Sequence, residues 1–323
     1  MCTAITYKTK DHYFGRNLDL ESTYHETITI TPRFYPFQFC YTGKVTEHHA
    51  MIGMATVSDN YPLYYEATNE YGLSMAALNF PGNAKYFPYQ DNAENVTPFE
   101  FIPWILSQCK TLDDARIHLQ KLNLVNTAFS EEYPTSPLHW MISDKTGSIT
   151  VESTEEGLNI FDNPVGVLTN NPTFTFHLQN LGNYINLSRE EPIARFWSDY
   201  EIVPYSRGMG AIGLPGDLSS ASRFIKAVFT KLHSTSGDSE EESVSQFFHI
   251  LNAVAQQRGC VKIGDKYEVT VYSSCCNTDK CIYYYTTYEN SQMTAIHLFH
   301  EDLAASKLRT FHLKKTQHIL LEN

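Results

Sequence analysis

Short runs of alternating polarity, rich in aromatic residues, recur along most of the chain and constrain its fold more than any other feature. Lys266–Tyr272 and Cys281–Tyr285 are typical, and their alternation predicts strands with one buried face. Turn-forming groups such as Tyr71-Gly72 and Lys145-Thr146-Gly147 separate neighbouring runs, so antiparallel hairpins should dominate. Further strands are predicted at 2–8, 12–19, 26–31, 49–57, 62–68, 73–79, 138–143, 148–153 and 158–161.

Helices are fewer. Thr97-Pro98-Phe99-Glu100 matches a capping box with proline at the first helical position, and Thr111 is placed to start a second helix. A third helix is predicted near Ser222. The clearest spans about 239–258, with Gly259 as its stop and an apolar stripe made by Val244, Phe247, Phe248, Leu251, Val254 and Ala255.

The order of these elements excludes a parallel sheet built from alternating strands and helices. Strands come first, followed by a helical pair, more strands, more helices and strands again. This order is typical of an α+β fold in which antiparallel sheets pack together with helices outside. No repeat, low-complexity linker or change in composition divides the chain, which predicts one domain over residues 1–323.

Charge argues against a nucleic-acid partner, and hydropathy argues against insertion into a membrane. The chain has 36 acidic and 24 basic residues and a formal charge of -12. It lacks the clustered Lys and Arg that phosphate backbones need, so no nucleic-acid partner is expected. No apolar stretch approaches the roughly 20 residues of a membrane span, and the N-terminus does not resemble a signal peptide. We therefore expect a cytoplasmic protein without membrane insertion.

Seven cysteines are an odd number, so we expect mostly free thiols rather than a disulfide framework. The spacing of Cys275, Cys276 and Cys281 does not match paired zinc ligands, and these residues are more typical of small buried strand positions. The thirteen histidines are scattered, and His139 and His177 are expected to pack or bond locally. No metal site is predicted.

Cys2 offers a more specific chemistry. Its small side chain permits removal of Met1, which would leave an amine and a thiol on one residue. The reference pKa values of the two groups, about 7.7–8.0 and about 8.5, allow the amine to accept the thiol proton without a histidine. Many chains have a small second residue by chance, so this feature alone is weak.

The segment Phe14–Asp19 strengthens the hypothesis. A turn near Lys10 would return it beside Cys2 as the second strand of a hairpin. Arg16 would then favour the thiolate, and Asp19 would hold the protonated amine. The alternative is an ordinary surface ion pair. Residues 16 and 19 would face opposite sides of a regular strand, so this hypothesis requires a bulge or a strand end near Leu18.

One motif suggests a nucleotide site but lacks its context. Gly208–Gly213 fits G-x-G-x-x-G, yet Leu214-Pro215-Gly216 follows directly and the next helix starts later. We interpret this segment as a loop that leads to Arg223.

A set of segments spread along the chain carries further information: Met1–Ala4, Phe14–Asp19, Ala77–Gly82, Val167–Pro172, Gly213–Asp217 with Ser222–Phe224, and Tyr272–Cys275. Together they resemble the choloylglycine hydrolases, the family of bile salt hydrolases and penicillin V acylases within the N-terminal-nucleophile hydrolases. The resemblance covers about residues 1–300 and implies a four-layer αββα sandwich with two stacked, mainly antiparallel sheets.

The resemblance also implies a set of site residues. Cys2 would be the nucleophile and, through its amine, the base, while Arg16 and Asp19 shape its ionisation. Asn170 would donate from its side chain to the oxyanion, Asn79 would add its backbone N–H, and Arg223 would complete the polar network. No cofactor is implied.

The implied substrates are conjugated bile salts such as glycocholate and taurocholate, and the implied assembly is a homotetramer. A rigid steroid needs an apolar pocket, although each candidate residue is also a plausible core residue. The predicted lining residues are Leu18, Tyr24, Tyr65, Ala67, Phe129, Tyr133 and Leu138, some of them in the loop 124–138.

Three alternatives stay open at this point. Penicillin V is the rival substrate, although Leu78-Asn79-Phe80-Pro81 is more similar to the bile salt hydrolase branch. A non-catalytic binder of apolar ligands would keep the fold without turnover, and a thiol redox sensor would use an oxidisable Cys2.

Overall fold

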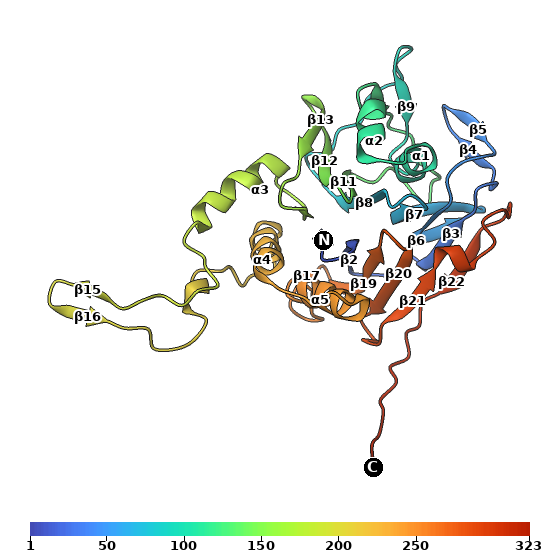
Figure 1. The fold of residues 1–323 in the computed structure, drawn as a ribbon. Coiled ribbons are helices and arrows are strands. Elements are labelled where there is room, and N and C mark those ends of the chain that lie inside the picture. The colour runs from blue at the N-terminus through green and yellow to red at the C-terminus, as the bar shows by residue number, and fades with distance from the viewer.

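Two antiparallel sheets lie face to face at the centre of the computed structural model, which describes residues 1–323 (Figure 1). The six-stranded sheet has the order β14-β1-β2-β19-β20-β21. Its strands are β1 (Cys2–Lys8), β2 (His12–Leu20), β14 (Val167–Leu168), β19 (Val269–Asn277), β20 (Ile282–Thr287) and β21 (Thr294–His297).

The eight-stranded sheet has the order β13-β12-β11-β8-β7-β6-β3-β22. Its strands are β3 (Thr27–Thr31), β6 (Met51–Ser58), β7 (Tyr61–Asn69), β8 (Ser74–Asn79), β11 (Leu138–Asp144), β12 (Gly147–Thr154), β13 (Gly157–Asp162) and β22 (Arg309–His312). Four short pairs lie outside the sheets: β4 (Phe37–Phe39) with β5 (Gly43–Val45), β9 (Glu94–Val96) with β10 (Leu122–Leu124), β15 (Arg195–Trp197) with β16 (Tyr200–Ile202), and β17 (Lys262–Ile263) with β18 (Lys266–Tyr267).

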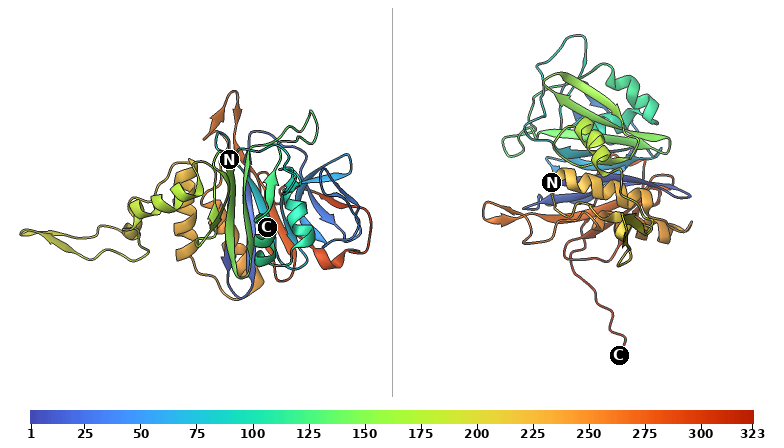
Figure 2. Two further views of the ribbon diagram at one scale, coloured as in Figure 1. Left: turned by 90° about the horizontal axis from the view of Figure 1, so that it is seen from above. Right: turned by 90° about the vertical axis from the view of Figure 1, so that its left-hand side faces the viewer.

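Helices cover both outer faces of the stacked sheets (Figure 2). Helices α1 (Phe101–Gln108) and α2 (Leu112–Leu119) share an apolar core with the eight-stranded sheet. Helices α4 (Ser220–His233) and α5 (Glu240–Asn252) pack on the six-stranded sheet, and α3 (Phe174–Asn180) packs beside α4. The four-layer α+β sandwich is confirmed. None of the helices is both long and apolar enough to cross a membrane.

The predicted start of the first helix at Thr97 is wrong. Thr97–Glu100 forms a turn in which the Glu100 N–H donates to the Thr97 carbonyl (3.0 Å). The Glu100 carboxylate accepts from the Cys40 N–H (2.8 Å) instead of capping a helix. A tertiary partner has replaced the local one, so α1 begins at Phe101. The capping box at Thr111 is confirmed, with Asp114 as its partner.

Two other predicted boundaries fail because α5 and β19 meet. Helix α5 ends at Asn252 rather than near 258, since Gln256 exchanges hydrogen bonds with Thr270 of β19. The predicted strand Lys266–Tyr272 breaks at Glu268, whose N–H donates to the Val261 carbonyl (3.0 Å). The break turns the Glu268 side chain toward the N-terminus of the chain.

Gly15 tests the close contact between β2 and β19. A methyl group there would overlap the Ser274 carbonyl oxygen and lie 2.9 Å from the Cys275 Cα. We expect Gly15→Ala to lower the free energy of unfolding by about 2 kcal/mol or more, measured by urea titration. Gly147→Ala, where no atom lies within 4 Å of the added carbon, should be nearly neutral. Equal losses in the two variants would contradict this packing.

His12 should make stability depend on pH. Burial lowers its pKa to about 4 from 6.5. The unfolded chain therefore takes up the proton first, and the His12 contribution to stability is full above pH 6.5 and lost as pH falls toward 4. In His12→Asn this dependence should disappear. The difference in unfolding free energy between wild type and variant should shrink across that window, and a constant difference in urea titrations would contradict it.

Candidate functional site

The β1–β2 hairpin places Cys2 directly opposite Leu18, so the predicted return of Phe14–Asp19 beside Cys2 is confirmed. Both strands lie inside the six-stranded sheet, where neighbours fix them on each side. Cys2 is buried, with 3% of its surface exposed, and its side chain lines a cavity. The thiol is therefore held on a rigid element at the edge of an internal space.

Arg16 and Asp19 approach Cys2 from opposite faces of the sheet. Arg16 points toward the eight-stranded sheet, where it reaches Ala77, while Asn17 faces α5 and donates to the Leu251 carbonyl (2.9 Å). Asp19, two residues from Asn17, shares its face. The bulge predicted near Leu18 is absent from β2 and lies in β19, between Thr270 and Tyr272. The prediction that a bulge or strand end in this segment is required to bring Arg16 and Asp19 to Cys2 is therefore wrong.

Arg16 fills a split between β7 and β8. These strands pair only from Glu66–Thr68 to Ser74–Ala76, because a bulge at Tyr65 shifts the register of β7. The Arg16 Nη1 donates to the freed carbonyls of Tyr65 (3.1 Å) and Ala77 (2.5 Å). Its Nη2 has no partner, and Arg16 lines the same cavity as Cys2. A fully buried guanidinium thus keeps a free donor beside the thiol.

Glu66 supplies the counter-charge that sequence reasoning missed. It is 2% exposed, its Oε2 lies 3.9 Å from the Arg16 Nε, and it accepts from Tyr272 (2.6 Å), Tyr283 (2.5 Å) and Ser274 (3.0 Å). Burial raises the pKa of Glu66, while Arg16 and these hydroxyls oppose the rise. The cluster spans both sheets. Alternation alone marks Glu66 as an ordinary strand residue, so nothing in the sequence singled it out.

Two acidic residues, Asp19 and Glu268, lie beside the N-terminus. The Met1 amino group forms an ion pair with Glu268 and donates to the Asp19 carbonyl oxygen (2.6 Å). The Asp19 Oδ1 accepts from Thr270 (2.6 Å), and its Oδ2 is buried without a partner. Burial raises the pKa of both Asp19 and Glu268. The site therefore has an anionic pocket for an amino group, and Glu268 was not predicted.

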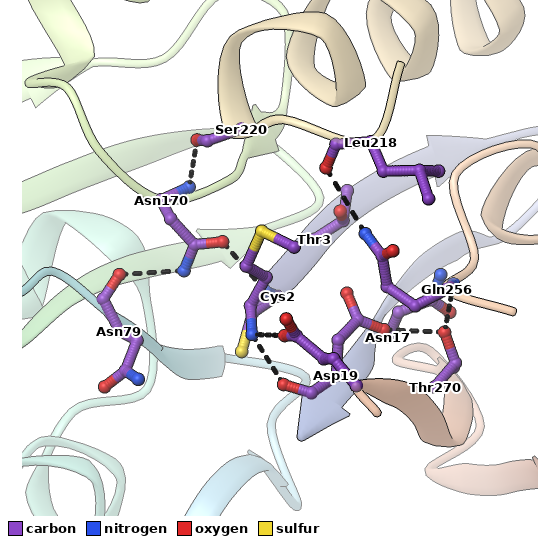
Figure 3. Close-up of polar contacts among 12 residues, drawn as sticks. Cys2, Thr3, Asn17, Asp19, Asn79, Asn170, Leu218, Ser220, Gln256 and Thr270 are labelled. Atoms are coloured by element: carbon purple, nitrogen blue, oxygen red, sulfur yellow. Dashed lines mark hydrogen bonds and ion pairs between the residues drawn. The ribbon is translucent and has the colours of Figure 1, made fainter. Parts of the chain in front are cut away.

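Asn170 is the hub of the polar contacts at Cys2 (Figure 3). Its Oδ1 accepts from the Cys2 N–H (2.8 Å) and from the Arg223 Nη2 (2.7 Å). Its Nδ2 donates to the Asn79 carbonyl (2.8 Å), and its own N–H donates to Ser220 (2.8 Å). One of the two Nδ2 hydrogens remains for another acceptor.

Two further polar groups near the thiol are the main-chain N–H of Asn79 and the side chain of Arg223. Because the Phe80 N–H donates to Pro137 of the neighbouring chain segment, the antiparallel ladder turns the Asn79 N–H away from β11. Arg223 donates to the Cys2 carbonyl (2.5 Å) and to the Thr3 hydroxyl (2.7 Å). The other five residues predicted for the polar site thus lie around Cys2.

A cavity of about 490 Å³ opens beside Cys2, Arg16 and Asn79, and 12 of its 21 lining residues are hydrophobic. Such a volume suits a ligand of steroid size. Six predicted residues line it: Leu18, Tyr24, Tyr65, Phe129, Tyr133 and Leu138. Arg16 and Glu132 are its two charged lining residues, so Arg16 is the one cation available to an anionic ligand.

Ala67 does not line the cavity, so that prediction is wrong. The bulge at Tyr65 changes which face of β7 each residue takes, and Ala67 packs with Met75 in the core under α1. Several lining residues were missed. Pro98 and Phe99 were misread as a helix start, and Leu20, Leu63 and Tyr64 lie on strands where a cavity-facing residue resembles a core residue.

Sequence comparison identifies relatives along nearly the whole chain. The model described as "Linear amide C-N hydrolases, choloylglycine hydrolase family" matches residues 2–311. A bile salt hydrolase/transferase of Lactiplantibacillus plantarum is 53% identical over 315 residues, 97% of each chain. A bile salt hydrolase/transferase of Clostridium perfringens is 39% identical over 325 residues, 99% of each chain.

Solved structures agree in fold. A variant of the conjugated bile acid hydrolase of Clostridium perfringens superposes with a TM-score of 0.93 at 37% identity, covering 100% of both chains. The penicillin V acylase of Agrobacterium tumefaciens gives a TM-score of 0.76 at 18% identity, covering 96% of this chain and 90% of that one, a likeness of fold. The chain belongs to the choloylglycine hydrolase family and has the N-terminal-nucleophile hydrolase fold.

Proposed function

We propose that this enzyme cleaves the amide bond of glycine- and taurine-conjugated bile salts with Cys2 as its nucleophile. The observation that carries the proposal is the Cys2 side chain at an apolar cavity of about 490 Å³, with the free Arg16 donor beside it. The names of the relatives at 53% and 39% identity support the substrate class. The products would be the free bile acid and glycine or taurine.

The reaction requires removal of Met1. The Cys2 nitrogen, which would become the amine, lies 2.8 Å from the Asn170 Oδ1. It is one residue from the Met1 amino group, which occupies the anionic pocket of Asp19 and Glu268. This amine takes the thiol proton, and the sulfur attacks the amide carbonyl carbon. The amine then protonates the leaving nitrogen. Water then attacks the resulting thioester while the amine takes its proton. The C–S bond breaks, the amine returns the proton to the sulfur, and the bile acid is released.

The remaining polar residues would stabilise charge during these steps. The second Nδ2 hydrogen of Asn170 and the Asn79 N–H are the donors proposed for the oxyanion. Arg16 lies on the cavity side with a free Nη2 donor, and Asp19 would hold the amine on the opposite face. Arg223 fixes the Cys2 carbonyl and the Asn170 side chain. No cofactor enters these steps.

The other candidates differ in turnover. A cavity of this volume and apolar lining favours a steroid over the smaller phenoxyacetyl group of penicillin V. A binder of apolar ligands or a thiol redox sensor would keep the cavity or the reactive Cys2 but would not release an amino acid.

We also propose a homotetramer of this chain, supported by a projecting arm. The β15–β16 hairpin extends away from the sheets (Figures 1 and 2) and exposes large apolar side chains, including Phe196 (66%), Trp197 (74%) and Tyr200 (74%). An exposed cluster of this kind is typical of an interface.

A cytoplasmic location and a single domain complete the proposal. All seven cysteines are free, which fits a reducing compartment. Both sheets combine distant parts of the chain, since β1 pairs with β14 and β3 with β22. This interleaving supports one domain over residues 1–323, and the mature chain of the proposed enzyme would begin at Cys2.

The first test measures amino acid release from glycocholate, taurocholate and penicillin V under reducing conditions, after mass spectrometry has confirmed that Met1 is absent. We expect either bile salt to be cleaved well above penicillin V. Cys2→Ser should lower the rate by about 10³-fold or more, because the hydroxyl is a weaker nucleophile.

The matched control is Cys260→Ser, which changes an exposed cysteine outside the cavity lining and should leave the rate unchanged. Penicillin V cleaved faster than both bile salts would transfer the assignment to the rival substrate. Binding of bile salts without cleavage by a processed chain would favour the non-catalytic binder.

The arm can be tested with Trp197→Asp and Tyr200→Asp together. Charged side chains cannot be buried in an apolar interface without a partner, so we expect the variant to lose the tetramer in light scattering coupled to size exclusion. Ile117→Asp, at a residue 64% exposed on α2, should keep four chains. A tetramer that survives the arm substitutions would contradict this interface.

A further inference from the structure

His139 lies on β11, is fully buried, and uses both ring nitrogens. Its Nε2 contacts the Thr169 carbonyl oxygen (2.9 Å), and its Nδ1 contacts the Glu152 carboxylate (3.1 Å). Its ring stacks on Phe80 with centroids 4.2 Å apart and an interplanar angle of 4°. The residue lines no part of the cavity, and the mechanism does not use it.

These contacts join the two segments that carry the proposed oxyanion donors. Phe80 follows Asn79 at the end of β8 in the eight-stranded sheet, and Thr169 precedes Asn170 after β14 in the six-stranded sheet. The two donors therefore come from different sheets. Their direct contact is the single hydrogen bond from the Asn170 Nδ2 to the Asn79 carbonyl (2.8 Å).

Two neighbours extend the same connection. The Glu152 Oε1 that contacts His139 also accepts from the Phe174 N–H at the start of α3 (2.9 Å). From that helix, the His177 Nε2 donates to the Asn170 carbonyl (2.8 Å). The main-chain carbonyls of Thr169 and Asn170 are thus held from β11 and α3, respectively.

We propose that His139 is a positioning residue that fixes the spacing of the two oxyanion donors across the sheets. The proposal rests on the proposed function. Stacking on Phe80 sets the Asn79 side, and the hydrogen bond to Thr169 sets the Asn170 side. Loss of either contact lets one donor move relative to the other, which weakens charge stabilisation in the transition state more than ground-state binding.

His48 provides a matched control. It is also buried, its Nε2 contacts the Tyr35 carbonyl (2.8 Å), its Nδ1 contacts the His49 carbonyl (2.9 Å), and its ring packs on Phe37 at 4.9 Å. None of these residues lines the cavity. His48 therefore resembles His139 in burial, in using both ring nitrogens and in packing on a phenylalanine, although both its partners are carbonyls, and it lies away from the proposed oxyanion donors.

The experiment compares kcat and KM for glycocholate in His139→Phe, His139→Gln, His48→Phe and His48→Gln, with thermal unfolding recorded for each. His139→Phe keeps the stacking and removes the hydrogen bonds, and we expect kcat to fall about 30-fold or more with KM within about three-fold of wild type. His139→Gln, which keeps a donor toward Thr169, should recover part of that loss. The His48 variants should keep kcat within about two-fold.

A folded His139→Phe enzyme with kcat within three-fold of wild type would overturn the proposal, as would a rise in KM at constant kcat. If His139→Phe does not fold, Phe80→Leu replaces it, because it removes the ring stacking on the Asn79 side, and an unchanged kcat in that variant overturns the proposal equally. Asn170→Ala distinguishes failure of the His139 proposal from failure of the proposed function. If Asn170→Ala cleaves glycocholate at the wild-type rate, the proposed oxyanion site itself fails, whatever the His139 variants do.

Discussion

The buried cation Arg16 determines how the two sheets meet at the site. A guanidinium without solvent needs counter-charge and acceptors, and the fold provides Glu66 on one side and the carbonyls of Tyr65 and Ala77 on the other. Those carbonyls are free because the bulge at Tyr65 ends the pairing of β7 with β8. The same irregularity brings Tyr65 to the cavity and sends Ala67 to the outer core. The buried Arg16, the interrupted pairing of β7 with β8 and the cavity therefore all depend on the bulge at Tyr65.

The opposite face of the β1–β2 hairpin binds the N-terminus instead of lining the cavity. Asp19, Glu268 and Thr270 surround the N-terminus, and Asn170 with Arg223 holds the Cys2 main chain. The sheet thus separates Arg16, beside the cavity, from Asp19, Glu268 and Arg223 on the opposite face. The separation follows from the alternation of β2, in which Arg16 and Asp19 lie an odd number of residues apart. It suits a residue that is to act as nucleophile and base through two different atoms.

Sequence alone predicted most of the longer strands and the return of Phe14–Asp19 beside Cys2, because alternation over several residues and a turn near Lys10 leave few other pairings. It failed where tertiary partners override local rules. Glu100 binds Cys40 instead of capping a helix, and Gln256 binds Thr270 where α5 was expected to continue. Six of the seven residues predicted for the pocket line it, and Ala67 was lost to a bulge that leaves no signal in the sequence. Glu66 and Glu268 were missed because a buried carboxylate is recognisable only beside its partner.

The central claim is that catalysis needs the free amine of Cys2. The most direct measurement compares glycine release from glycocholate by two preparations of the same chain, one beginning at Cys2 and one that keeps Met1, with both masses verified. The account predicts release by the processed chain alone, because Met1 converts the catalytic amine into an amide and places its own amino group against Glu268. Equal rates from both preparations would contradict it.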